Sequence, residues 1–452
     1  MIKMKISQRH LLRRSVALTA ALLTANVALA EPLKLTIESS VELALSDNPT
    51  IKIADLEVER YDYVRKTTMG SLLPQLSVDG NYNRTLKNQS MAEGFSLGAD
   101  QYSTVTATAN LSLALYSPAI YRTLKMNATE AASAVESARS SRIELVAAVK
   151  NSFYGVLLAE RSLVVLEQSA ETSKQTVDET QIKFDNGLAS EYDLLTAQVQ
   201  YSNLQPAIME ARSSIATAKD LLKMYLSLPL ETQITITGDL DRLREVVMVS
   251  STQLDRNISE NSSIKSLALS RDILSHQLRI TNASRLPVLS AYGQLSVTGN
   301  DMGSFSLDGS TSSTPADFFW QRPSSVGLSL SVPIFSGLSN TNRSRQLVNQ
   351  IDQLTLQQSY TEDSVNVTLS SAISDINTAR EQLFAQLTTV EQATKAYKIS
   401  NTRYSSGTGT ILELNTSRLT LTQAELNLSE AIYNLLTAKS EYNRIIGSQS
   451  IE

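Results

Sequence analysis

The chain has 452 residues, no cysteine, and an acidic balance of 40 Lys and Arg against 45 Asp and Glu. Without cysteine it can form neither a disulfide nor a thiolate metal site, and it offers no cysteine for a lipid anchor. An acidic chain without a basic stripe is a poor ligand for nucleic acid, whose phosphates are bound by Lys and Arg. We therefore expect no nucleic-acid partner.

Residues 1–30 have the pattern of a secretory signal peptide. Basic residues precede an apolar run over 16–29, and Ala28-Leu29-Ala30 fits a small-x-small cleavage site. The Arg13-Arg14 pair alone is weak support for twin-arginine export, so the ordinary route is favoured. Cleavage after Ala30 would remove five basic and no acidic residues, which leaves a formal charge of −10 on the exported chain.

Residues 31–248 form the first of two predicted structural repeats. Apolar and polar residues alternate in two stretches, which predicts strands with one apolar and one polar face, whereas apolar residues recur every three or four positions in the helices. In chain order we expect a helix from Asn48-Pro49, strands over 74–84 and 103–116, helices over 118–185 and 190–227, and a mixed segment over 228–248.

Residues 249–452 repeat this order, so the chain contains an internal two-fold sequence repeat. Leu73-Pro74 corresponds to Leu286-Pro287, and Phe184-Asp185-Asn186-Gly187 corresponds to Tyr404-Ser405-Ser406-Gly407. Gly187 and Gly407 end the long helices as left-handed turn residues. In the second repeat we expect a helix, strands over 287–298 and 324–335, and helices over 338–404 and 410–446.

The four strands suit a membrane better than a soluble sheet. Beyond residue 30 there is no run of about 18 apolar residues, so any membrane span must consist of strands, and about ten residues suffice for one. Four strands cannot close a barrel, which needs about eight, so the sheet must close between chains. Three copies would supply twelve strands, but the pattern alone does not select three over two or four.

A polar loop is expected over 299–323, and it ends in Phe318-Phe319-Trp320. These aromatic residues form either a hydrophobic plug in the loop or an aromatic belt at a membrane interface. The adjacent spanning strands favour the belt.

The chain resembles the TolC-type outer-membrane efflux and secretion channels. The resemblance rests on the order and spacing of several motifs and on their duplication in the two halves of the chain. The motifs are Leu72-Leu73-Pro74-Gln75-Leu76, Val332-Pro333-Ile334-Phe335-Ser336-Gly337, Arg403-Tyr404-Ser405-Ser406-Gly407 and Ile411-Leu412-Glu413-Leu414. It implies an α+β membrane protein in which a homotrimer forms a twelve-stranded outer-membrane β-barrel, continuous with a long periplasmic α-helical barrel. It also implies a Gram-negative host, a periplasmic adaptor protein and an inner-membrane pump of the RND or ABC type.

The resemblance further implies a gate at the helical tips. The positions that match the family's gate are Asp193, Tyr404, Gly409, Glu413 and Thr416. Gly409 stands where the family has an arginine, and Thr416 removes one ring of carboxylates. Either other contacts hold the tip, such as Arg403 or Asp193 with Tyr404, or the tip closes less firmly. Asp193 could instead serve only as a favourable charge at a helix N-terminus, and Tyr404 could simply pack at a helix end.

The sequence contains no pattern typical of an enzyme. His276 is the single histidine of the exported chain, and no nucleophile elbow, phosphate loop or metal-ligand spacing occurs. We expect no catalytic activity, no cofactor and no metal. Two functions remain: an outer-membrane exit duct of an efflux or type I secretion system, or a periplasmic or surface structural protein built on helical hairpins. The lipid-length apolar strand faces favour the duct.

Overall fold

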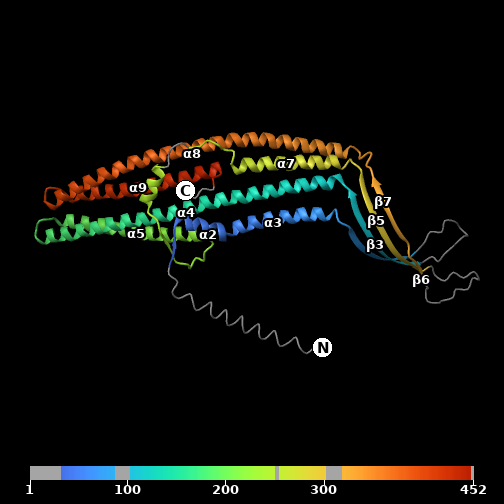
Figure 1. Cartoon of the computed structure of the whole chain (residues 1–452). Coiled ribbons are helices and arrows are strands. Elements are labelled where there is room, and N and C mark those ends of the chain that lie inside the picture. Colours follow the sequence, from blue (N-terminus) through green and yellow to red (C-terminus); the bar gives the residue numbers. More distant parts are fainter. Residues whose placement is uncertain (1–31, 87–101, 250–253, 302–317, 449–452) are drawn as a thin grey trace, which may run out of the picture. The chain divides into compact units, whose positions relative to one another are not determined.

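The computed structural model describes residues 32–86, 102–249, 254–301 and 318–448, which divide into two compact units (Figure 1). The sheet unit comprises residues 53–139 and 262–363, and the hairpin unit comprises residues 1–52, 140–261 and 364–452, in each case where described. Two long helices, α4 (Pro118–Asp185) and α8 (Ser339–Ser405), begin in the sheet unit and continue in the hairpin unit.

The sheet unit is built on antiparallel strands in the order β2 (Gln75–Thr85), β3 (Tyr102–Tyr116), β5 (Val288–Asp301) and β7 (Ser324–Ser331). A further strand, β6 (Phe318–Gln321), pairs with the far end of β5. The prediction of a loop over 299–323 is therefore wrong at both ends. At its start, β5 extends to Asp301, and near its end the three aromatic residues belong to β6. The last expected strand is also too long, since β7 ends two residues before Pro333, which lacks an N–H for the ladder.

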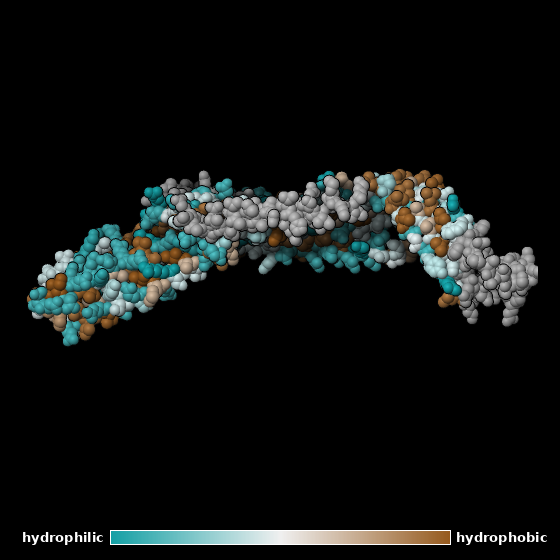
Figure 2. Space-filling view, turned by 90° about the horizontal axis from the view of Figure 1, so that it is seen from below, coloured by the Kyte–Doolittle hydropathy of each residue, from teal (hydrophilic) through white to brown (hydrophobic). Residues whose placement is uncertain are grey.

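The sheet has one apolar and one polar face. Paired residues form rows across it, and one apolar row consists of Leu76, Leu111, Gly293 and Val326. On the other face Asn110 Nδ2 donates to Asp79 Oδ2 at 3.0 Å. Apolar side chains of β2 and β7 are exposed, and Figure 2 shows hydrophobic residues gathered over the strands. The apolar face therefore lacks a cover within the described chain.

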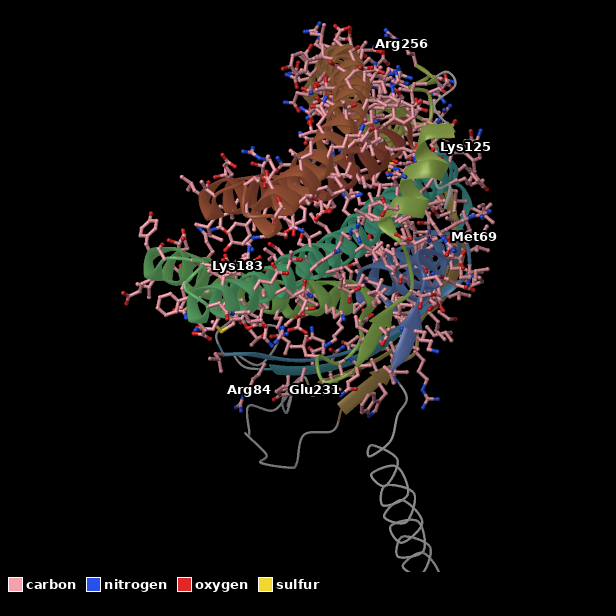
Figure 3. The ribbon with its side chains drawn as sticks, turned by 90° about the vertical axis from the view of Figure 1, so that its left-hand side faces the viewer. Met69, Arg84, Lys125, Lys183, Glu231 and Arg256 are labelled. Carbon is pink, nitrogen blue, oxygen red and sulfur yellow. The ribbon has the colours of Figure 1, made fainter. Side chains whose placement is uncertain are left out.

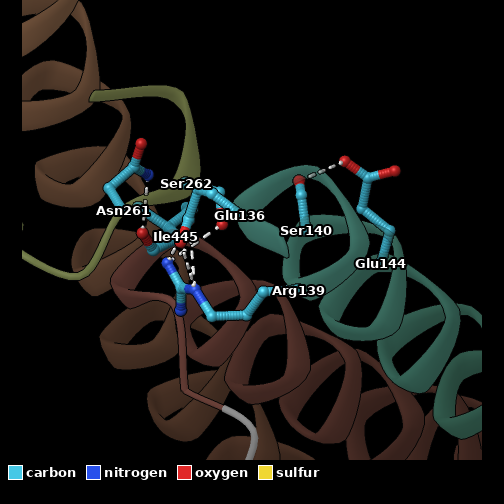
Figure 4. Close-up of polar contacts among 7 residues, drawn as sticks. All are labelled: Glu136, Arg139, Ser140, Glu144, Asn261, Ser262 and Ile445. Carbon is cyan, nitrogen blue, oxygen red and sulfur yellow. Dashed lines mark hydrogen bonds and ion pairs between the residues drawn. The ribbon is translucent and has the colours of Figure 1, made fainter. Parts of the chain in front are cut away.

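Helices α3 (Pro49–Gly70) and α7 (Ser262–Ala283) lie beside the first parts of α4 and α8, respectively (Figure 1). Asn127 Nδ2 of α4 donates to Thr68 Oγ1 at 2.6 Å, and Ser344 Oγ of α8 donates to Asn282 Oδ1 at 3.1 Å. Arg139 pairs with Glu136 at 2.6 Å and donates to Ser262 Oγ, which joins α4 to the start of α7 (Figure 4). Among the described residues, no helix carries a stretch apolar and long enough to cross a membrane.

The hairpin unit contains two helical hairpins, one of α4 with α5 (Glu191–Leu226) and one of α8 with α9 (Ile411–Ile446). All four helices contribute to their shared core. Phe153 of α4, Leu222 and Leu226 of α5 and Leu383 of α8 are fully buried, and Leu435 and Leu436 of α9 are almost fully buried. Apolar residues at helical spacing produce this core because they fall on one face of each helix.

Short elements pack onto this core. β1 (Leu33–Leu35) pairs in parallel with β4 (Ile234–Ile236), next to α2 (Ile37–Asp47) and α6 (Leu240–Val249). The mixed segment thus contains a strand and a helix.

The two halves of the chain use an equivalent asparagine contact in the hairpin unit. Asn48 Nδ2 donates to the Tyr225 carbonyl oxygen at 2.8 Å. Asn261 Nδ2 donates to the Ile445 carbonyl oxygen, also at 2.8 Å, as Figure 4 shows. Both asparagines are buried, and both acceptors lie in the last turn of a hairpin helix. These bonds satisfy carbonyl groups that a helix end leaves without an intrahelical partner. The equivalence supports the internal sequence repeat.

Candidate functional site

The two hairpin turns have the same backbone design. Gly187 and Gly407 have φ values of 71° and 77°, a left-handed conformation that glycine adopts without steric cost. The amide of Leu188 donates to the Lys183 carbonyl at 2.7 Å, and the amide of Thr408 donates to the Arg403 carbonyl at 2.9 Å. Both glycines therefore lie where the sequence predicts them, at the ends of α4 and α8.

The residues after the turns differ between the two hairpins. Ser190 caps α5, and its partner Asp193 closes a capping box by accepting from the Ser190 amide at 3.2 Å and from Ser190 Oγ at 2.7 Å. Thr410 caps α9 through the amide of Glu413, whose carboxylate does not complete a box. Asp193 thus stabilises the start of its own helix, which fits the simpler of the two interpretations of this residue.

The carboxylate of Glu413 reaches across the second turn to Arg403. Glu413 Oε2 lies 3.4 Å from Arg403 Nη1, and both side chains are about half exposed. An exposed ion pair of this kind contributes about 0–1 kcal/mol. Its main effect is electrostatic, because it places a positive charge beside the carboxylate expected to line the tip. Thr416, the other candidate ring position, is exposed in α9.

Gly409 lies close to the backbone of the second turn. Its amide donates to the Arg403 carbonyl at 3.0 Å. A Cβ atom at this position would lie 3.0 Å from Arg403 Cβ and 3.1 Å from the Tyr404 amide nitrogen. A side chain at this position would therefore require the neighbouring residues to shift by a few tenths of an ångström.

Tyr404 is buried between the two hairpins of the hairpin unit. Its hydroxyl lies 2.6 Å from Thr180 Oγ1 of α4. Lys183, near the end of α4 (Figure 3), places its Nζ 4.1 Å from the centre of the Tyr404 ring and donates to the Tyr404 carbonyl at 2.8 Å. These contacts join α4 to α8.

The pKa of the Tyr404 phenol is raised, chiefly by burial and to a smaller extent by the charge of Asp193, while the bond with Thr180 opposes the shift. No hydrogen bond between Asp193 and Tyr404 is present in the described structure. Thr180 and Lys183 belong to no motif that the sequence patterns identify. They lie three positions apart, on one face of α4, and this spacing indicates that they could share a partner. It does not indicate that the partner is Tyr404.

The indole ring of Trp320 packs over Gly299 of β5. Trp320 pairs with Gly299 across β5 and β6, and a Cβ atom at position 299 would lie 2.9 Å from the indole ring. The indole is about half exposed. Phe318 and Phe319 lie in the same strand, β6. Because Trp320 and Gly299 are paired across the two strands, the indole can cover the glycine. A cross-strand aromatic residue is a known way to stabilise a glycine in a strand.

The described residues contain no group of three or more His, Asp or Glu side chains placed to hold a metal ion. His276 is partly buried in α7. The site at the tips therefore consists of turn glycines, a carboxylate beside an arginine, and a tyrosine bound to α4.

Comparisons with known proteins agree on one family. The profile of the outer membrane efflux protein family matches residues 40–226 and 254–448. The alkaline protease secretion protein AprF of Pseudomonas aeruginosa is 24% identical over 405 residues, which cover 88% of this chain and 81% of that protein. The outer membrane protein TolC of Vibrio cholerae is 20% identical over 384 residues, which cover 85% of this chain and 84% of that protein.

Solved structures have the same fold. The Campylobacter jejuni CmeC outer membrane channel superposes with a TM-score of 0.71 at 17% identity, covering 92% of this chain and 86% of that chain. Because the family profile spans most of both sequence repeats, the conclusion does not rest on one motif. The chain belongs to the outer membrane efflux protein family.

Proposed function

We propose that this protein is the exit duct of a tripartite efflux or type I secretion system, through which cargo passes passively from the periplasm to the exterior. Family membership and the described fold support this function over a structural role. The single observation that carries it is the combination, in one chain, of a sheet with an exposed apolar face and long helical hairpins that end in exposed turns. The protein is located in the outer membrane of a Gram-negative bacterium, like the other members of its family.

The duct is completed by three copies of the chain. In the sheet, β2 and β7 each have one edge without a strand partner among the described residues. Such edges cannot remain open in lipid, because their backbone groups would lack hydrogen bonds. Pairing of β2 with β7 of the next copy would close a twelve-stranded barrel. The number three rests on the family resemblance.

The tips of the helical hairpins form the gate and the narrowest part of the duct. In this proposal Glu413 supplies the carboxylate ring, Tyr404 holds α8 to α4 through Thr180 and Lys183, and Asp193 orders the first turn. A ring of carboxylates at a narrow point of a channel favours the passage of cations, and divalent cations that bind there block the current. The nearby Arg403 would moderate this charge.

The remaining assignments support the same function. Residues 1–30 act as the signal peptide, and the repeats cover 31–248 and 249–452. Phe318, Phe319 and Trp320 form the aromatic belt. The partners are a periplasmic adaptor and an inner-membrane RND or ABC pump, and the protein has no catalytic role.

The test is single-channel recording on the purified chain from Glu31 in a planar bilayer. We expect a small, steady, cation-favouring current that divalent cations block from the helical side. Glu413→Gln should weaken that block, because it removes the ring carboxylate. Glu430→Gln is the matched control, since Glu430 is an exposed carboxylate of the same helix well away from the turn.

A folded protein that never inserts would overturn the exit duct and favour the structural role. Equal block by divalent cations in wild type, Glu413→Gln and Glu430→Gln would be compatible with the exit duct. It would show that Glu413 does not line the narrowest point.

A further inference from the structure

The contact between α4 and α9 includes more buried polar residues toward the turns than it does near the core. Near the core, Val149, Phe153 and Val156 of α4 and Ile432, Leu435 and Leu436 of α9 are buried and apolar. Toward the turns, a small apolar cluster around Tyr404, Ile411 and Leu414 lies beside a set of buried polar residues. We call this set the polar seam: Ser169, Ser173, Thr176 and Thr180 of α4, with Asn415, Arg418 and Thr422 of α9. The residues of each helix recur at three and four positions, the spacing of a packed helical face.

Hydrogen bonds across the polar seam are few. Thr422 Oγ1 donates to Ser169 Oγ at 2.9 Å, and Arg418 Nη1 lies 3.4 Å from Thr176 Oγ1. Asn415 Nδ2 and Ser173 Oγ are buried without a partner among the described residues. Buried polar groups without partners destabilise a contact, whereas the apolar pairs nearer the core stabilise it.

Arg418 is the only cationic member of the polar seam, and it is 4% exposed. Its second contact is a 2.8 Å bond from Nη2 to Asn415 Oδ1 on its own helix. No carboxylate within the described residues pairs with it, and burial lowers the pKa of its guanidinium, with Tyr397 opposing the shift. A buried cation held only by neutral groups does not recover the free energy lost with its hydration.

We propose that Arg418 determines how readily the duct opens, because its buried, uncompensated charge weakens the contact between α4 and α9 near the tips. When α9 moves away from α4, water hydrates the guanidinium and the unpartnered groups of the polar seam. The apolar contacts nearer the core remain closed and act as the fixed end of the movement. This inference rests on the proposed exit duct for its role in opening, but not for the weakness of the seam.

The opposite role for Arg418 is a clasp, in which its bonds to Thr176 and Asn415 hold the closed state. The two roles predict opposite effects of substitution. Arg418→Met keeps much of the side-chain volume and removes the buried charge. Thr176→Asp keeps Arg418 and supplies a carboxylate at the position of its partner on α4. If the charge weakens the seam, both changes strengthen it, although their chemistry differs.

The experiment is hydrogen–deuterium exchange on the purified full-length oligomer, read on peptides within residues 411–429, together with single-channel recording. We expect exchange in this segment to slow by about tenfold in Arg418→Met and in Thr176→Asp, because removal or pairing of a buried charge stabilises the closed contact. Opening in the bilayer should fall to a similar extent. Arg212→Met and Gln175→Asp, at exposed positions of α5 and α4, are the matched controls and should match wild type.

Faster exchange and larger currents in Arg418→Met would establish the clasp and overturn the proposal. Exchange like that of wild type in both seam variants would overturn it as well, since the charge would then have no effect on the contact. Exchange could slow in both seam variants while wild type itself never conducts. That result would support the weakness of the polar seam but overturn both the exit duct and the role of Arg418 in opening.

Discussion

Tyr404 shows how one residue can join two helices that sequence patterns treat as independent. Its hydroxyl and ring contact Thr180 and Lys183, whereas the resemblance pointed to Asp193. Asp193 is engaged instead with Ser190 at the start of α5. In this chain, therefore, Tyr404 and Asp193 make separate contacts, although the resemblance placed them at one gate.

Tyr404→Phe should make the closed tip less stable. The change removes the 2.6 Å bond to Thr180, and a buried hydrogen bond contributes about 1 kcal/mol, so we expect an increase of about fivefold in open probability in single-channel recordings. Tyr360→Phe is the control, because Tyr360 is an exposed tyrosine of the same helix. Equal currents in the two variants would mean that the phenol does not hold the tip.

Lys150 should make stability depend on pH. Burial lowers its pKa, the charge of Lys439 adds to the shift, and Glu38 opposes it. Because the native lysine loses its proton at lower pH than the unfolded one, stability rises with pH between the two pKa values. Lys150→Met should therefore raise the midpoint of thermal unfolding at neutral pH.

This advantage should shrink as pH rises toward the unfolded lysine pKa of about 10.4. Lys34→Met is the control at an exposed position and should give no pH-dependent difference. An advantage of Lys150→Met that is the same at every pH would show that packing, and not charge, is responsible.

At the scale of elements, helices and strands follow from periodicity, but their ends do not. The break between β6 and β7 coincides with Arg322-Pro323, yet the Pro323 carbonyl still accepts from the Ser296 amide at 2.9 Å. Pairing with β5 thus orders aromatic residues that composition alone assigns to a loop. The partner strand supplies the hydrogen bonds, so the extent of β6 depends on tertiary structure.

Gly299→Ala should displace the indole of Trp320, since the added methyl group would lie 2.9 Å from the ring. Trp320 is the single tryptophan of the chain, so its fluorescence emission reports this position directly. We expect a shift in emission wavelength in Gly299→Ala. Gly80→Ala should leave the emission unchanged, because open space surrounds the added methyl group. Identical spectra in both variants would contradict the packing of Trp320 over Gly299.

At the scale of the whole molecule, the exposed strand edges predict the assembly. The chain has no cysteine, so a double variant with Ser77→Cys in β2 and Ser325→Cys in β7 carries the only reactive thiols. A short bis-maleimide should link copies into dimers and trimers and no larger species, because both edges are used when the barrel closes.

Ser77→Cys alone is the control and should remain monomeric on a denaturing gel. Tetramers in the double variant would show a different number of copies, and monomers alone would argue against closure of the barrel between β2 and β7.

The sequence by itself determined the elements and the family. Alternation with a period of two and recurrence with a period of 3.6 reflect which residues share a face, and they require only local order. The internal repeat then indicated two similar halves, and the motifs in duplicate carried the resemblance that the family profile confirms.

Only the tertiary structure decided which residues meet at the tips. Thr180 and Tyr404 are 224 positions apart, and Thr176 and Arg418 are 242 apart. Pairings over such separations depend on the rotation and register of packed helices, and many combinations satisfy the same local pattern. The buried charge of Arg418 is the clearest case, because an arginine at helical spacing is typical of an exposed face until its neighbours are known.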